Sequence, residues 1–287
     1  MPELPEVEVV RRGMQQLVVG KQVAGLDVLN VGSYDASSSL AGRTFVAARR
    51  RAKMLLLDLD DGHTLAVHLK MTGQLVVRGA SDWGGGHPSD SLIGDLPDRQ
   101  TRVIIDLDDG SRLFFNDQRK FGWMRLLPTS DANALTAGLG PEPFEDDAWP
   151  RFRERVRCHE KAVVKATLLD QHVVAGIGNI YADEALWAAR VHPAARVGQL
   201  TDRALKRILE SAADSMELSI ELGGSTARNY VDAEGRRGAY LDFAQVFARQ
   251  GQPCHRCGTL IMKTRVAGRG THLCPRCQRL PKGAKEL

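Results

Sequence analysis

Four cysteines near the end of the chain set the strongest constraint on its fold. They form two close pairs, and the pattern reads Cys254-x2-Cys257-x16-Cys274-x2-Cys277. Two such pairs joined by a loop of this length bring four thiolates to the corners of a tetrahedron around zinc. The pattern predicts one structural Zn²⁺ ion in a cysteine hairpin, with no open coordination position for catalysis.

Other residues in the sequence bear on this site and on the cellular setting. His255 and His272 are close enough to be rival ligands, although four cysteines already fill a tetrahedral shell. Cys158 stands apart, and we expect a buried free thiol or small hydrophobic residue there. An odd number of cysteines, four of them in one segment, does not fit a secreted disulfide scaffold and favours a reducing, cytoplasmic setting.

Length and composition indicate a globular protein of more than one domain. The chain has 287 residues, of which 43% are hydrophobic and 26% charged, close to globular averages. No apolar run approaches the roughly 18 residues of a membrane helix, and the N-terminus lacks the basic start and apolar core of a secretory signal. We therefore expect a soluble protein with no membrane partner.

Charge is distributed unevenly along the chain. Residues 1–150 carry 16 Lys and Arg against 21 Asp and Glu, whereas residues 151–287 carry 23 against 14. A basic half indicates contact with a polyanion such as nucleic acid, although a solvated basic surface would give the same composition.

The pattern of the first half predicts antiparallel sheet with one helix. Apolar residues at helical spacing predict a helix over Pro5–Val18. Asp60-Asp61-Gly62 and Asp108-Asp109-Gly110 each separate two β-rich runs, and Asp-Gly pairs in that position are typical of tight hairpins. The glycine-rich stretch Trp83–Asp90 has no periodicity, and we expect a flexible surface insertion there.

The second half reads differently. Residues 138–150 contain a Gly/Pro-rich linker, and apolar periodicity then predicts helices over Arg151–Leu169, Ile180–Arg190 and Asp202–Leu222. A turn punctuated by glycines lies just before the second of these helices. The second domain is therefore expected to be helical and to end in the cysteine hairpin.

The residues after Met1 form a candidate catalytic group. A small second residue favours removal of Met1, which would leave Pro2 with a free secondary amine. With a pKa near 7.8 this amine is about a tenth to a fifth neutral at pH 7, whereas a lysine is about 0.04% neutral. Glu3 and Glu6 beside it either supply paired-carboxyl acid–base chemistry or stabilise the N-terminus of the helix through its dipole.

Three separated segments resemble the bacterial formamidopyrimidine-DNA glycosylase family, part of the wider formamidopyrimidine-DNA glycosylase and endonuclease VIII group. They are the opening Met1–Glu8, the segment Gly176–Glu184 and the four-cysteine hairpin. The resemblance covers essentially the whole chain in the right order.

This resemblance implies an α+β fold. An N-terminal antiparallel β-sandwich with a helix (1–137, catalytic) is followed by a linker (138–150). A helix-two-turn-helix domain with a lesion-capping loop (151–240) then leads to the zinc finger (241–287).

It also implies a cytoplasmic, monomeric enzyme of base-excision repair that acts on damaged double-stranded DNA. The enzyme is both a DNA glycosylase and a lyase at apurinic or apyrimidinic sites. It excises 8-oxoguanine and formamidopyrimidines and cleaves the strand by β,δ-elimination through a Schiff base on Pro2.

The same resemblance assigns roles to single residues. In the active site, Glu3 is the general acid toward the sugar ring oxygen, Glu6 assists, and Lys53 holds a phosphate beside the lesion. The DNA-binding residues are Met71, Arg119, Lys120, Phe121, Lys165, Asn179 and Arg269.

These DNA-binding residues differ in what they contact. Asn179 and Arg269 match phosphate contacts, and Met71, Arg119 and Phe121 match residues that fill the space left by an extruded nucleotide. Residues 223–240 match a lid over the damaged base.

Without the resemblance several of these residues have plainer interpretations. Met71 and Phe121 would be core residues, Lys53 would belong to a solvated charge cluster, and Asn179 would be a helix N-cap. For the whole chain, the alternatives are an endonuclease VIII-type enzyme for oxidised pyrimidines and a noncatalytic zinc-finger DNA-binding protein.

The sequence departs from the family pattern at three places. Lys120 stands where the family often has arginine, which loses a bidentate phosphate contact. Phe247-Ala248-Arg249 replaces Tyr-Gly-Arg, and the lid begins Gly224-Ser225-Thr226 with its hydroxyl residues in an altered order. These departures affect the expected lesion preference rather than the amine.

Overall fold

The computed structural model describes residues 2–36, 38–225 and 239–281. The chain divides into two compact units: Met1–Ala137 with Ser219–Tyr240, and Gly138–Leu218 with Leu241–Leu287. These units are defined by contacts in space, whereas the expected domains are continuous stretches of sequence. The expected domain boundaries therefore stay a prediction.

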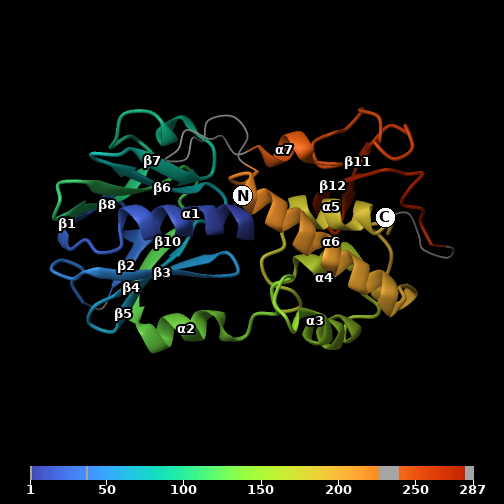
Figure 1. Ribbon diagram of the computed structural model, residues 1–287, viewed down its shortest axis with the longest axis horizontal. Helices are drawn as coiled ribbons and strands as arrows, with labels where there is room; N and C mark the ends of the chain where they lie inside the picture. Colours follow the sequence, from blue (N-terminus) through green and yellow to red (C-terminus); the bar gives the residue numbers. More distant parts are fainter. Residues whose placement is uncertain (1, 37, 226–238, 282–287) are drawn as a thin grey trace. The chain divides into compact units, whose positions relative to one another are not determined.

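Two five-stranded sheets form the first unit (Figure 1). One sheet has the order β1 (Val23–Val28), β8 (Thr101–Leu107), β9 (Arg112–Asp117), β6 (Gly73–Arg78) and β7 (Trp83–Gly86). The other has the order β2 (Tyr34–Ala36), β10 (Trp123–Pro128), β5 (His63–His68), β4 (Met54–Leu59) and β3 (Phe45–Arg51). Neighbouring strands are antiparallel except β2 and β10. The expected β-sandwich is confirmed.

Both expected hairpins are present. Strand β4 pairs with β5 around Asp60-Asp61-Gly62, and β8 pairs with β9 around Asp108-Asp109-Gly110. Each turn has its glycine at a positive φ, 80° at Gly62 and 81° at Gly110, a conformation that glycine adopts without steric cost. The two Asp-Gly pairs therefore predicted both turns correctly.

Helix α1 (Leu4–Leu17) packs along one edge of the sandwich. It contacts β7, the edge strand of one sheet, and β3, the edge strand of the other (Figure 1). Val7, Val10 and Met14 face a core in which each is at most 1% exposed. The apolar spacing read from the sequence is thus the buried face of this helix, which also covers two strand edges.

The expectation of a flexible insertion at Trp83–Asp90 is wrong. Trp83 begins β7, which pairs with β6, and all four residues of β7 are buried. The Trp83 indole packs on Gly13 of α1, where a Cβ would lie 2.3 Å from the ring. The glycines that break the sequence pattern give the helix room to pack on this strand.

The second unit holds most of the helices and the cysteine hairpin. Its helices are α3 (Ala148–Arg157), α4 (Val164–Leu169), α5 (Asn179–Ala188) and the larger part of α6 (Asp202–Glu221). Two strands, β11 (Met262–Val266) and β12 (Arg269–Leu273), form the hairpin. The short elements of the chain are α2 (Thr129–Ala137), α7 (Tyr240–Phe243), η1 (Val31–Ser33), η2 (Asp90–Leu92) and η3 (Val197–Gln199). None of the helices in the described part of the chain is long and apolar enough to be a membrane span.

One predicted helix is divided in two. The helix expected over Arg151–Leu169 ends at Arg157, and α4 starts only at Val164 because Val163 forms a β-bridge with Arg196. Cys158 lies at the end of α3 and is exposed, so the expectation of a buried thiol there is wrong. A non-local backbone bridge cannot be read from local periodicity.

Candidate active site and zinc site

The N-terminus of α1 buries two of the predicted catalytic carboxyl groups. Pro2 is buried, Glu3 is 2% exposed and Glu6 is 5% exposed. The Glu3 N–H donates to Glu6 Oε2 at 2.8 Å, and Glu3 is the N-cap residue of the helix. A carboxylate at this position is stabilised by the helix dipole and by free backbone N–H groups. The structure thus confirms that Glu3 and Glu6 lie at the helix N-terminus, and their catalytic role stays a prediction.

Glu6 also joins the helix to the first described residues of the expected lid. Its Oε1 accepts the Ser225 N–H at 2.9 Å. Gly224 has φ +94°, and the Tyr240 N–H donates to its carbonyl at 3.2 Å. Both ends of the segment expected to form the lid therefore meet beside Glu6, while residues 226–238 lie outside the described residues.

Lys53 lies in the turn between β3 and β4 and is half-buried. Burial, together with the positive charges of Lys70 and Lys53, lowers the pKa of His68 to about 3. His68 is therefore neutral at pH 7, and its Nδ1 accepts the Lys70 N–H at 3.1 Å. His68 was not predicted as a site residue.

The arginines before Lys53 do not form a solvated cluster. Arg49 Nε donates to Asp58 at 2.5 Å, and Arg50 Nε lies 3.2 Å from Glu8 on α1. These ion pairs fix the strand that precedes Lys53.

The residues predicted to fill the duplex lie on two loops of the first unit. Phe121 is 54% exposed, and the Arg119 guanidinium lies 4.8 Å from the centre of its ring. Lys120 between them is exposed with φ +58°. Met71 lies on the loop between β5 and β6 and is partly exposed. The interpretation of Phe121 as a core residue is wrong, because a core residue would be buried.

In the second unit, the predicted phosphate-binding residues Asn179 and Arg269 lie near one another. Asn179 is the first residue of α5, and its Nδ2 donates to the carbonyl of Gly270 at 3.0 Å. Arg269 directly precedes Gly270 at the start of β12 and is exposed. The N-terminus of α5, where N–H groups favour anions, thus lies next to the start of β12, which carries the exposed Arg269.

Lys165 occupies a different environment from the one expected of a DNA contact. It is 0% exposed, and its Nζ donates to Asp183 Oδ1 (2.6 Å), Thr271 Oγ1 (2.7 Å) and the Gly270 carbonyl (3.1 Å). An ammonium group has three N–H donors, and all three are used inside the unit. We therefore assign Lys165 to holding β12 against α4 and α5, rather than to DNA.

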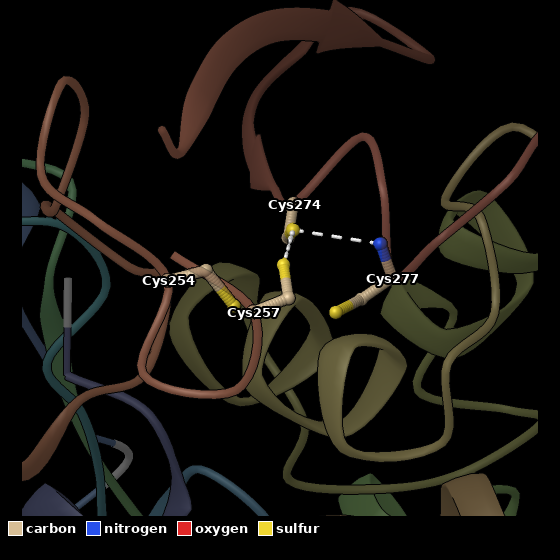
Figure 2. A group of neighbouring side chains, drawn as sticks. All are labelled: Cys254, Cys257, Cys274 and Cys277. Carbon is tan, nitrogen blue, oxygen red and sulfur yellow. Dashed lines mark hydrogen bonds between the residues drawn. The ribbon is translucent and has the colours of Figure 1, made fainter. Parts of the chain in front are cut away.

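The four cysteines converge as predicted (Figure 2). Their Sγ atoms all lie within 4.8 Å of one another, and Sγ of Cys257 lies 3.5 Å from Sγ of Cys274. Tetrahedral zinc with Zn–S bonds of about 2.3 Å needs S···S distances of about 3.8 Å. This arrangement fits zinc with four thiolate ligands and no site for a substrate.

The two rival histidines have other partners. His272 Nδ1 lies 3.4 Å from Asp183 Oδ2, and His255 Nδ1 lies 3.1 Å from both Gln245 and Arg249. In the described residues, the group of side chains arranged for a metal contains cysteines alone.

Helix α5 carries the finger through consecutive residues. Asp183 accepts the His272 N–H at 2.8 Å, and Glu184 accepts the N–H groups of residues 245, 246 and 247 at 2.7–2.9 Å. Burial raises the pKa of Glu184 although these N–H groups oppose the shift. Trp187 Nε1 donates to Cys254 Sγ at 3.4 Å. The motif Gly176–Glu184 thus supports the zinc finger through Asp183 and Glu184, and it also contains Asn179, whose phosphate contact stays a prediction.

Comparisons with known proteins decide the family. The formamidopyrimidine-DNA glycosylase N-terminal domain matches residues 1–124, the H2TH domain of the same glycosylase matches 139–231, and the zinc finger found in FPG and IleRS matches 251–280. A formamidopyrimidine-DNA glycosylase of Herpetosiphon aurantiacus is 42% identical over 97% of this chain and 100% of its own length. The chain belongs to the formamidopyrimidine-DNA glycosylase family.

Other relatives extend the comparison to structures with DNA. The Streptococcus mutans formamidopyrimidine-DNA glycosylase is 40% identical over 97% of this chain and 100% of its own length. A Lactococcus lactis FPG variant bound to Fapy-dG containing DNA has a TM-score of 0.85 and 33% identity, covering 97% of this chain and 100% of that one. The Lactococcus lactis protein bound to abasic-site DNA has a TM-score of 0.84, 32% identity and the same coverage.

One departure from the formamidopyrimidine-DNA glycosylase pattern has a structural consequence. Ala248, where the family often has glycine, adopts φ +59°, a left-handed conformation that costs a residue with a Cβ about 1 kcal/mol. Arg249 after it is 9% exposed and donates to the carbonyls of Gln245 and Pro253. Arg249 therefore holds the strained turn at Ala248 in place.

Removing the metal is expected to weaken DNA binding. Chelation, or Cys277→Ser, should remove zinc and weaken binding to abasic-site DNA about tenfold or more, because the thiolates fix the hairpin that carries Arg269. Metal analysis and fluorescence anisotropy check this, with Cys158→Ser as the matched control because Cys158 is exposed and outside the cluster. Wild-type affinity in a zinc-free variant would contradict the structural role.

Proposed function

We propose that this chain excises oxidised purines from double-stranded DNA and cleaves the resulting abasic site. The observation that carries the proposal is the N-terminus of α1, where Pro2, Glu3 and Glu6 are buried together. Relatives at about 40% identity are formamidopyrimidine-DNA glycosylases, and solved structures of a relative hold Fapy-dG and abasic-site DNA.

The proposed chemistry begins with removal of Met1, because an amide nitrogen is not a nucleophile. The freed Pro2 amine attacks C1′ of the damaged nucleotide, and the bond from C1′ to the base breaks. The base leaves with the electron pair of that bond and takes up the proton released by the amine. Glu3 donates a proton to the ring oxygen as the sugar opens to a Schiff base. Loss of a C2′ proton then expels the 3′ phosphate, and a second elimination expels the 5′ phosphate. Hydrolysis frees the amine.

The remaining residues position the DNA in this proposal. Lys53, Asn179 and Arg269 contact backbone phosphates, and Lys120 supports that contact without the fork of an arginine. Met71, Arg119 and Phe121 enter the duplex in place of the extruded nucleotide. Lys165 acts indirectly, through the strand that carries Arg269.

We also propose a single zinc ion held by the four cysteines, a monomeric protein and a cytoplasmic location. The ion holds the finger and takes no part in bond cleavage, since four thiolates leave no open position.

Oxidised pyrimidines form the second candidate substrate class. A solved structure of the Lactococcus lactis FPG contains DNA with an oxidised pyrimidine. Both lesion types therefore belong in the test of this chain. The opening Met1–Glu8, in particular Leu4 and Val7, favours the purine branch.

The test is a panel of duplexes that carry 8-oxoguanine, an oxidised pyrimidine or no lesion. We expect release of 8-oxoguanine, strand ends with phosphate on both sides of a one-nucleotide gap, and slower release of the pyrimidine. Faster pyrimidine release would favour the endonuclease VIII-type alternative. Binding of the damaged duplexes without base release would favour the noncatalytic DNA-binding protein.

A further inference from the structure

Asp117 is a fully buried carboxylate beside the loop that carries Arg119 and Phe121. It is 0% exposed and is the last residue of β9. Burying a carboxylate is costly unless hydrogen-bond donors surround it. The donors that surround Asp117 therefore show what this residue holds in place.

Two loops cross between the sheets of the sandwich side by side. One runs from β5 to β6 and carries Met71, and the other runs from β9 to β10 and carries Phe121. Gly73 pairs with Asp117 at one end of these loops, and His68 pairs with Trp123 at the other. The strand register therefore sets the two loops next to each other.

The Asp117 carboxylate joins these loops. Its Oδ1 accepts the Thr72 hydroxyl in a short hydrogen bond and the Arg119 N–H at 3.1 Å. Its Oδ2 accepts the Gly122 N–H at 2.6 Å, and the Arg119 N–H also reaches Thr72 Oγ1 at 3.0 Å. Thr72 directly follows Met71, so one buried group is bonded to both loops.

The surroundings leave the second loop little freedom. A Cβ on Gly122 would lie 2.8 Å from the Phe115 ring and 3.0 Å from Asp117 Oδ2. The Arg102 guanidinium donates to the carbonyl of Asp117 at 2.8 Å. Phe121 nevertheless stands 54% exposed, so the buried bonds hold an apolar side chain out of the core.

We propose that Asp117 and Thr72 are positioning residues that hold Met71, Arg119 and Phe121 as one preformed wedge. This inference rests on the proposed function. Holding the three side chains in place before binding removes the entropy cost of ordering them in the duplex. This linkage, the hydrogen bonds that Asp117 and Thr72 make between the two loops, therefore promotes base extrusion. It has no part in the reactions of the Pro2 amine.

The experiment compares two single-turnover rates: excision from a paired 8-oxoguanine duplex and cleavage at a preformed abasic site. Thr72→Val removes the hydroxyl with little change of shape and should lower excision about fivefold or more while sparing abasic cleavage. Thr72→Ser should restore excision to within about twofold of the wild type. Thr64→Val is the matched control, because Thr64 is also buried and donates to a carboxylate, Asp58, at 2.7 Å.

A double-mutant cycle distinguishes positioning from a general loss of structure. Phe121→Ala should slow excision by a clearly larger factor in the wild type than in Thr72→Val or Asp117→Leu, since a displaced loop has already lost the wedge. Equal factors in both backgrounds would overturn the linkage. So would equal loss of excision and abasic cleavage, or a Thr72→Val variant that behaves like the Thr64→Val control. A wild-type protein inactive on both substrates would instead overturn the proposed function.

Discussion

Glu3→Gln is expected to lower the rate of 8-oxoguanine release by about 10²- to 10⁴-fold, the range for loss of a positioned general acid. Glutamine has the size of glutamate and keeps the backbone N–H that donates to Glu6. It cannot donate an acidic proton to the sugar ring oxygen. The helix should therefore persist while the proposed proton transfer is lost.

Glu8→Gln provides the matched control for this prediction. Glu8 lies on the same helix and pairs with Arg11 at 2.9 Å and Arg50 at 3.2 Å, and it has no proposed role in the reaction. Single-turnover kinetics and duplex affinity should be measured for both variants. A Glu3→Gln rate within threefold of the Glu8→Gln rate would remove Glu3 from the proposed mechanism.

Lys165→Met is expected to destabilise the packing of β12 against α4 and α5 by about 3–5 kcal/mol. This is the cost of leaving one partner of a buried ion pair alone. Asp183 and Lys165 are both 0% exposed, and their charged atoms lie 2.6 Å apart. Methionine matches the length of the lysine stem but bonds neither Asp183 nor Thr271. The double variant Lys165→Met/Asp183→Asn removes the stranded charge and should regain most of the stability.

Hydrogen exchange of the β12 amides measures this effect locally. Lys206→Met is the control, since Lys206 is exposed and its pair with Glu210, at 3.7 Å, is a surface i,i+4 pair worth about 0.5 kcal/mol or less. If Lys165→Met were as stable as Lys206→Met, or the double variant as unstable as the single one, the buried pair would not be what holds β12.

Local signals in the sequence were sufficient for the elements that depend on local chemistry. The Asp-Gly turns, the apolar faces of α1 and α6 and the four cysteines each carry their information within about 20 residues, and each was predicted correctly. Turn geometry, helical periodicity and ligand spacing are all short-range constraints.

Several features that the sequence did not predict depend on contacts between residues distant in the sequence. The Trp83 ring packs on Gly13, and the buried Lys165 ammonium donates to Thr271. The role that we propose for Asp117 depends on its hydrogen bond with Thr72, 45 residues earlier. Asp117 was not predicted as a site residue, because the partner that explains it is distant in the sequence.

Reductive trapping identifies the atom that attacks C1′, which we propose to be the Pro2 nitrogen. Wild-type protein is mixed with an 8-oxoguanine duplex in the presence of borohydride, and the covalent adduct is digested and mapped by mass spectrometry. We expect a protein lacking Met1 with DNA attached to the Pro2 nitrogen. An adduct mapped to a lysine such as Lys53, or full activity in protein that retains Met1, would show that the Pro2 amine is not the nucleophile.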